Sequence, residues 1–62
     1  MEEKYLYDIV LDEKCIVNSG DLDFYTKEEA QEDADDYIIS ELSNEYKRKV
    51  SDFKVLIYKK FI

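Results

Sequence analysis

Residues 26–42 read TKEEAQEDADDYIISEL, and this stretch decides the fold. Thr26 followed by Glu29 forms a capping box, in which the threonine hydroxyl accepts a hydrogen bond from the backbone N–H three residues on. The apolar residues that follow recur at helical spacing and form one stripe: Ala30, Ala34, Tyr37, Ile38 and Leu42. The pattern predicts the one long helix of the chain, with small apolar side chains near its start and bulky ones near its end.

The end of this helix is less clearly marked than its beginning. Ser43-Asn44 would stop the helix after Leu42. However, Tyr46 and Val50 continue the same apolar stripe, so a helix that extends to about Arg48 is the alternative.

Three other stretches alternate in the manner of β-strands: residues 4–11, 14–18 and 52–61. Their core-facing sets are predicted to be Tyr5, Tyr7, Ile9 and Leu11 in the first, and Phe53, Val55, Ile57, Lys59 and Phe61 in the last. Asp12-Glu13 connects the first two, residues 18–21 form the clearest turn, and residues 22–25 provide a short extended piece. We therefore expect an α+β fold, a single ββαβ domain over residues 1–62, with a three- to four-stranded antiparallel or mixed sheet and one helix on one face.

Charge is distributed unevenly along these 62 residues. The net charge is −7, but residues 1–46 hold 15 acidic and 3 basic side chains, whereas residues 47–62 hold 1 and 6. A surface this acidic repels phosphate, which argues against direct binding of nucleic acid. The basic cluster Lys47-Arg48-Lys49 is expected to offset acidic charge within the fold.

The composition predicts no catalytic, cofactor-binding or metal site, and hence no enzyme. The chain has no histidine and one glycine, which removes histidine-based catalysis, histidine-ligated zinc and glycine-rich phosphate loops. Cys15, the single cysteine, is expected to be a small buried hydrophobe in a cytoplasmic protein. No apolar run is long enough to span a membrane.

The polar face of the predicted helix carries an acidic ridge, which we define as Glu28, Glu32, Asp33, Asp35 and Asp36. Acids near a helix N-terminus complement its dipole, so a solvated face is one interpretation. Asp35 and Asp36 lie beyond the first turn, where that benefit fades. The other interpretation is therefore that the ridge binds a protein partner with a basic surface. In size and charge the chain resembles the small acidic inhibitors by which phages and mobile elements block host nucleic-acid-binding proteins through imitation of DNA.

A second contact surface is expected on the sheet face that one helix leaves bare. This outer face, defined by Leu6, Val10, Leu56 and Tyr58, is half apolar. The alternative function is therefore an interaction domain that forms a homodimer through the outer face, with the acidic helix serving solubility alone.

Overall fold

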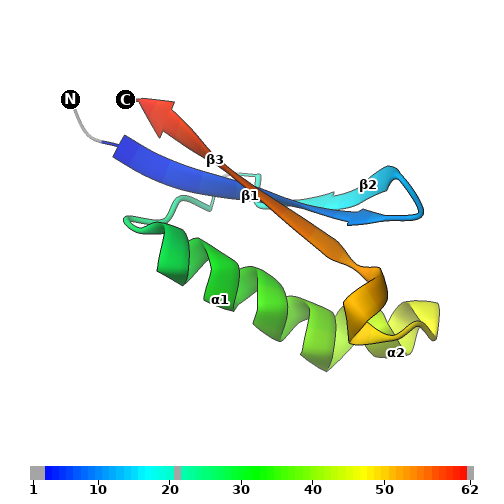
Figure 1. Ribbon diagram of the computed structural model, residues 1–62. Helices are drawn as coiled ribbons and strands as arrows, with labels where there is room; N and C mark the ends of the chain where they lie inside the picture. Colours follow the sequence, from blue (N-terminus) through cyan, green and yellow to red (C-terminus); the bar gives the residue numbers. More distant parts are fainter. Residues whose placement is uncertain (1–2, 21, 62) are drawn as a thin grey trace.

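The computed structural model describes residues 3–20 and 22–61. Three strands, β1 (Glu3–Leu11), β2 (Lys14–Asn18) and β3 (Lys54–Phe61), form an antiparallel sheet in the order β2-β1-β3. The helical segment consists of α1 (Lys27–Tyr37), a π-helical turn (Ile38–Leu42) and α2 (Ser43–Tyr46), and it forms a second layer against one face of the sheet (Figure 1). The predicted α+β fold, with ββαβ order and one helix on one face, is confirmed.

The helix begins at its predicted cap and runs for 20 residues. The Thr26 hydroxyl accepts a hydrogen bond from the Glu29 backbone N–H at 3.1 Å. The helix continues past Leu42, as the alternative held, and its last residue, Tyr46, precedes Arg48 by two. It ends there because Lys47 adopts the left-handed conformation, with φ of 54°, which cannot continue the helix.

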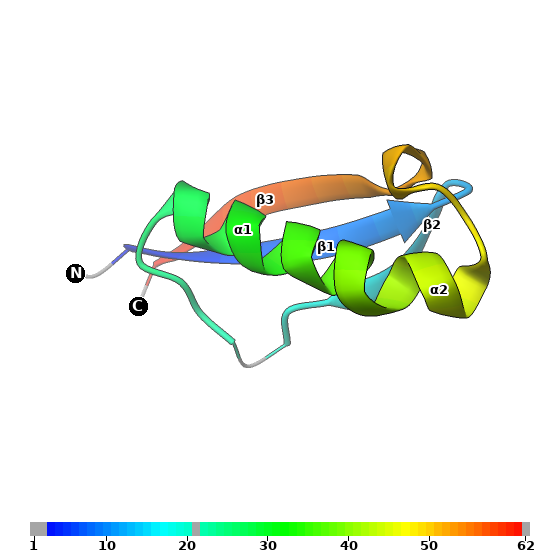
Figure 2. The ribbon, with the colours of Figure 1, turned by 90° about the horizontal axis from the view of Figure 1, so that it is seen from below.

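Small residues at the start of the helix bring it close to the sheet. Ala30 and Ala34 have no exposed surface, and Ile38 and Leu42 are buried in the later turns, as the stripe predicted. The segment runs obliquely across the sheet, so that its start lies beside β3 and its end lies toward the hairpin of β1 and β2 (Figure 2). The core between the two layers consists of these four residues with Tyr7, Ile9, Leu11 and Phe53.

Alternation along the strands agrees with the predicted core face except at the end of β3. Val55 and Ile57 are half-buried and pack against the core. Strand alternation places Lys59 and Phe61 on the helix side of the sheet. Lys59 is nevertheless exposed and Phe61 is 62% exposed, so the prediction that both contribute to the core is wrong. The reason is the length of the helix layer: Ile57 already lies beside its first turn, and the last residues of β3 run past it.

A two-residue turn and a bulge set the register of the β1–β2 hairpin. Asp12 and Glu13 both have positive φ, 52° and 68°, which is the type I′ geometry that suits the twist of a hairpin. Val10 lies opposite Cys15 and Ile9 opposite Val17, so one extra residue of β2 forms a β-bulge. Cys15 is exposed, and its predicted burial is wrong, because its partner Val10 belongs to the face away from the helix.

The fourth strand is reduced to a single bridge. Tyr5 and Phe24 exchange two backbone hydrogen bonds, of 2.8 and 3.0 Å, where the β1 edge extends past β2. Between this bridge and the end of β2, the Tyr7 backbone N–H donates to the buried Ser19 hydroxyl at 3.1 Å, and the Ser19 N–H donates to the Tyr7 carbonyl at 2.9 Å. Asp21, in the expected turn, lies outside the described residues. The backbone groups of Tyr5 and Tyr7, on the edge of β1 beyond β2, thereby have hydrogen-bond partners.

Substitution of Glu13 by glycine is expected to stabilise the protein. A non-glycine residue at positive φ costs about 1–3 kcal/mol, and loss of that strain outweighs the added entropy of the unfolded chain. We expect Glu13→Gly to raise the free energy of unfolding by about 0.5–1 kcal/mol, and the melting temperature by several degrees in a thermal scan. The control Glu45→Gly, in the exposed helix, should lower stability by about 1 kcal/mol. A lower melting temperature for Glu13→Gly would contradict the type I′ turn.

Candidate functional site

The acidic ridge lies on the solvent side of α1. The two alanines of the helix face the sheet, and helical spacing then directs the ridge carboxylates outward. All five side chains are exposed: Glu28, Glu32, Asp33, Asp35 and Asp36. The ridge is therefore exposed to solvent, as the sequence pattern predicts.

Two ridge carboxylates also serve the fold. Asp33 accepts a hydrogen bond from the Tyr7 hydroxyl at 2.8 Å, and it thereby ties the helix to the central strand. Burial, followed by this hydrogen bond, raises the pKa of Tyr7 well above its usual value. Asp35 accepts a hydrogen bond from the Gln31 amide at 3.0 Å. In the part of the chain that the structure describes, Glu28, Glu32 and Asp36 have no hydrogen bond or ion pair through their carboxylates.

The helix carries two more acidic residues beyond the end of the acidic ridge. Because the helix continues to Tyr46, Glu41 and Glu45 are helical and exposed as well. The signal for this extension was present in the sequence, since Tyr46 continues the apolar stripe. Tyr46 is 42% exposed, and its ring packs edge-on against the Phe53 ring, with 6.2 Å between centroids.

Two open concavities flank the ridge. The larger, of about 410 Å³, lies between α1 and β3, and we call it the α1–β3 groove. Its lining residues are Lys27, Glu28, Gln31, Glu32 and Ile57. The smaller, of about 270 Å³, lies on the other side of the helix and is lined by Phe24, Glu29, Glu32, Asp33 and Asp36. Glu32 borders both, so the ridge separates two hollows instead of crowning a uniformly convex surface.

The outer face of the sheet has the predicted members, placed together by the register. Leu6 lies directly opposite Tyr58, while Leu56 lies opposite Asp8 and Val10 opposite Lys54. Leu6 and Val10 are half-buried by their neighbours, whereas Leu56 and Tyr58 are 50% and 42% exposed. Charged residues interrupt the apolar surface at each step along the strands.

Tyr58 is held by a polar contact within the outer face. Its hydroxyl donates a hydrogen bond to the Asp8 carboxylate, and this bond, more than its burial, raises the pKa of Tyr58 to about 12. Both side chains border a hollow of about 270 Å³, together with Leu6 and the exposed Cys15. The outer face is therefore partly polar, and it is less suited to a dry interface than a continuous apolar patch would be.

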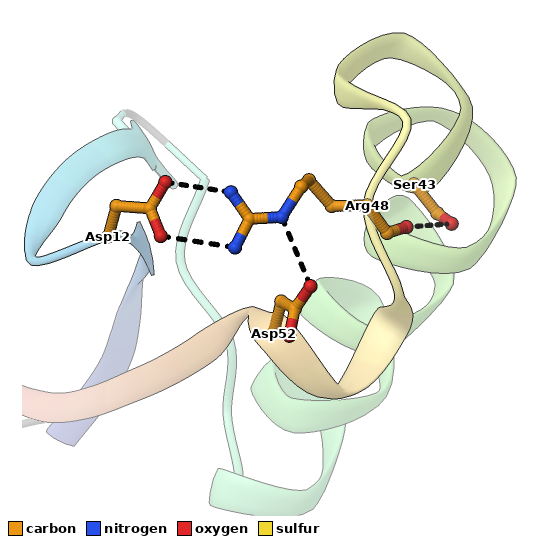
Figure 3. Close-up of polar contacts among 4 residues, drawn as sticks. All are labelled: Asp12, Ser43, Arg48 and Asp52. Atoms are coloured by element: carbon orange, nitrogen blue, oxygen red, sulfur yellow. Dashed lines mark hydrogen bonds and ion pairs between the residues drawn. The ribbon is translucent and has the colours of Figure 1, made fainter.

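The basic cluster is largely used within the fold through Arg48. Its guanidinium donates two hydrogen bonds to the Asp12 carboxylate, at 2.7 and 3.1 Å, and a third to Asp52 at 3.1 Å (Figure 3). The Arg48 backbone N–H and carbonyl both bond to Ser43, at 3.1 and 2.8 Å. This contact, which we call the Arg48 clasp, joins the β1–β2 turn, the end of the helix and the start of β3. The predicted offset of acidic charge within the fold applies to this residue.

Two lysines of β3 are also paired within the fold. Lys59 lies 3.8 Å from the Glu3 carboxylate, and Lys60 lies 3.8 Å from Asp23. Strand alternation directs Lys54 and Lys60 to the outer face, opposite the helix layer. Lys54 and Lys60 therefore lie on the face of the molecule opposite the acidic ridge, and neither of these two lysines neutralises the ridge.

Among residues 3–20 and 22–61, no group of three histidine, cysteine, aspartate or glutamate side chains is arranged to hold a metal ion. Within the same residues, the helices are too short and too polar to cross a membrane. Comparison with protein-family models, curated proteins and solved structures found no significant match.

The Arg48 clasp predicts a specific loss of stability in acid. The Arg48 hydrogen bonds lower the pKa of Asp12 from its ordinary value of 3.8, so the contact contributes fully above pH 3.8 and is lost as the pH falls through the lowered pKa. We expect Arg48→Gln to lower the melting temperature at pH 7. The difference from wild type should shrink below pH 3.8.

Lys49→Gln provides the matched control for this series, because it removes one neighbouring positive charge that is exposed and has no ion pair among the described residues. Melting temperatures of the three proteins between neutral and strongly acidic pH are the measurement. A difference between wild type and Arg48→Gln that does not change with pH would contradict the pairing with Asp12.

Proposed function

We propose that this protein is a small non-enzymatic module that binds the basic surface of a nucleic-acid-binding protein, and so inhibits or regulates it. The observation that carries the proposal is the exposed acidic ridge, in which Glu28, Glu32 and Asp36 lack basic partners in the described chain. Arg48, Lys59 and Lys60 are engaged elsewhere, in the Arg48 clasp and in the ion pairs of β3. Lys27, which lines the α1–β3 groove with Glu28 and Glu32, forms no ion pair with them among the described residues.

The arrangement of charge along the helix supports imitation of DNA. Eight carboxylates lie on it: Glu28, Glu29, Glu32, Asp33, Asp35, Asp36, Glu41 and Glu45. At about 1.5 Å per residue they span about 26 Å, which is a mean axial spacing of about 3.6 Å. One strand of B-DNA carries a phosphate about every 3.4 Å along its axis, so a lysine- and arginine-lined groove would meet a similar charge density.

The stability of the helix does not account for this arrangement. Two pairs of negative side chains lie four residues apart on the helix: Glu28 with Glu32, and Glu32 with Asp36. Each such pair of equal charges destabilises a helix by about 0.2–0.5 kcal/mol. A benefit from the helix dipole is confined to the first turn. A binding role would explain why acids continue to Glu45 at this energetic cost.

The proposal is tested by affinity capture from a cell lysate with salt-stepped elution, followed by competition with a short DNA duplex. We expect a basic nucleic-acid-binding protein that is released by moderate salt, because exposed charges are screened within about 8 Å at physiological salt. The duplex should displace the same protein. Reversal of two ridge charges in Asp35→Lys/Asp36→Lys should abolish capture.

The matched comparison is Asp36→Lys against Glu13→Lys, because each adds the same charge and only the first lies on the ridge. We expect Asp36→Lys to weaken capture of the identified protein several-fold and Glu13→Lys to leave it near wild type. Equal weakening would mean that net charge alone governs binding. Full affinity in the double reversal, with the fold intact by circular dichroism, would refute the proposal.

Homodimerisation through the outer face is the second candidate function. It is favoured by the exposure of Leu56 and Tyr58, which are 50% and 42% exposed side by side with Leu6. If this face joins two copies, Leu56→Glu should yield monomers, whereas Ile39→Glu, at a helix residue that is 59% exposed, should leave the dimer intact. Sedimentation over a wide range of protein concentration is the measurement. A wild-type protein that remains monomeric throughout would exclude this candidate.

A further inference from the structure

β3 is an edge strand over its whole length. It pairs with β1 on one side, and no described residue pairs with its backbone on the other side. The opposite edge of the sheet is better protected, because β2 is short and bulged, and the bridge at Phe24 covers the rest of β1. The sheet thus has one long open edge, and that edge borders the α1–β3 groove.

The hydrogen bonds of β1 determine which groups of β3 are free. Tyr5 and Tyr7 direct their backbone N–H and C=O groups toward Phe24 and Ser19, away from β3. Alternation in an antiparallel ladder therefore turns the intervening residues of β1 toward β3, where they pair with Lys54, Leu56, Tyr58 and Lys60. The remaining residues of β3 direct their backbone groups to the open edge: Val55, Ile57, Lys59 and Phe61.

The residues with free backbone groups are those whose side chains face the helix layer. A strand added antiparallel to β3 would place the residue opposite Ile57 on that same face. Its side chain would enter the α1–β3 groove, of about 410 Å³, which is lined by Ile57, Glu28 and Glu32 together with Lys27 and Gln31. The carboxylates of Glu28 and Glu32 have no basic partner in the described chain. A long cationic side chain fits this position, with its stem on Ile57 and its charge at the carboxylates.

We propose that the open edge of β3 binds an extended peptide as a fourth, antiparallel strand, with an arginine or lysine opposite Ile57 and apolar residues opposite Leu56 and Tyr58. This inference rests on the proposed function, because Glu28 and Glu32 belong to the acidic ridge. Main-chain hydrogen bonds to the edge give affinity, and the groove gives specificity.

The lysines of β3 define the occupant further. Like charges directly opposite on neighbouring strands are destabilising, so a run of basic residues would be disfavoured beside Lys59 and Lys60. Lysines at a sheet edge also oppose pairing between two copies of the same strand. The partner segment therefore has one basic residue at the groove and neutral residues on either side of it.

A synthetic peptide with the sequence Thr-Thr-Thr-Val-Arg-Val-Thr, acetylated and amidated, is the probe, because its arginine can lie opposite Ile57 and its valines opposite Tyr58 and Leu56. In the free protein, the amide protons of Val55, Ile57 and Lys59 should exchange with solvent faster than those of Leu56 and Tyr58. Bound peptide should slow the exchange of the first set and leave the second unchanged, as measured by NMR on the labelled protein.

Peptides with backbone N-methyl groups provide a control that leaves the protein and all side chains unaltered. In the antiparallel arrangement, the arginine and the threonine two places before it donate to β3, whereas the two valines donate away from it. Methylation of the first pair of amides should weaken binding by at least about tenfold, since it removes two edge hydrogen bonds and adds bulk there. Methylation of the valine amides should leave affinity near that of the parent peptide.

The groove is tested by Glu28→Gln/Glu32→Gln, with Glu41→Gln/Glu45→Gln as the charge-matched control on the far end of the helix. We expect the first variant to bind the peptide about fivefold more weakly, with a smaller dependence of the affinity on salt, and the control variant to bind it nearly as wild type does. Exchange of the peptide arginine for glutamine should weaken binding to wild type but not to Glu28→Gln/Glu32→Gln.

Three results would overturn the inference: equal effects of the two methylation patterns, no slowing of exchange at Val55, Ile57 and Lys59, or self-association of the protein that slows these amides without peptide. The last would assign the edge to a second copy. Each leaves the proposed function standing if Asp35→Lys/Asp36→Lys still abolishes capture of the basic protein, so the two failures are distinguishable.

Discussion

The close contact of one helix with one face of a three-stranded sheet is the constraint on which the rest of this structure depends. Ala30 and Ala34 have no exposed surface, and any larger side chain there would push α1 away from β1 and β3. Among the described residues, the helical segment of residues 27–46 covers one face of the sheet, so the other sheet face and the far side of this helix remain in solvent. The surfaces available for binding are therefore consequences of how the core is closed.

Polar contacts between residues far apart in the sequence join the elements that surround this small core. The Arg48 clasp links the β1–β2 turn to the end of the helix and the start of β3, and the bond from Tyr7 to Asp33 links the central strand to α1. These contacts also determine the surface charge. Arg48, Lys59 and Lys60 are paired with acids of the sheet and loops, so the ridge on the helix keeps its negative charge.

Much of the fold could be predicted from residue patterns because those patterns report local geometry. Alternation in β1 identified Tyr7, Ile9 and Leu11 as buried, and helical spacing identified Ala30, Ala34, Ile38 and Leu42. The errors arose where a distant element decides exposure. Phe61 belongs to the core-facing set of β3, but the helix layer does not reach it. Cys15 lies in an apolar strand, but the register places it opposite Val10 on the uncovered face.

The candidate site divides in the same way. The sequence by itself determined the α+β class, the capped amphipathic helix and the acidic ridge, because periodicity and charge at consecutive positions of one helix are local properties. Only the tertiary structure decided that β3 is an open edge, that Ile57 meets Glu28 and Glu32 in one groove, and that Arg48 is engaged with Asp12. Strand order, register and the direction of the helix across the sheet bring these residues together, and such relations arise between segments that are remote in the chain.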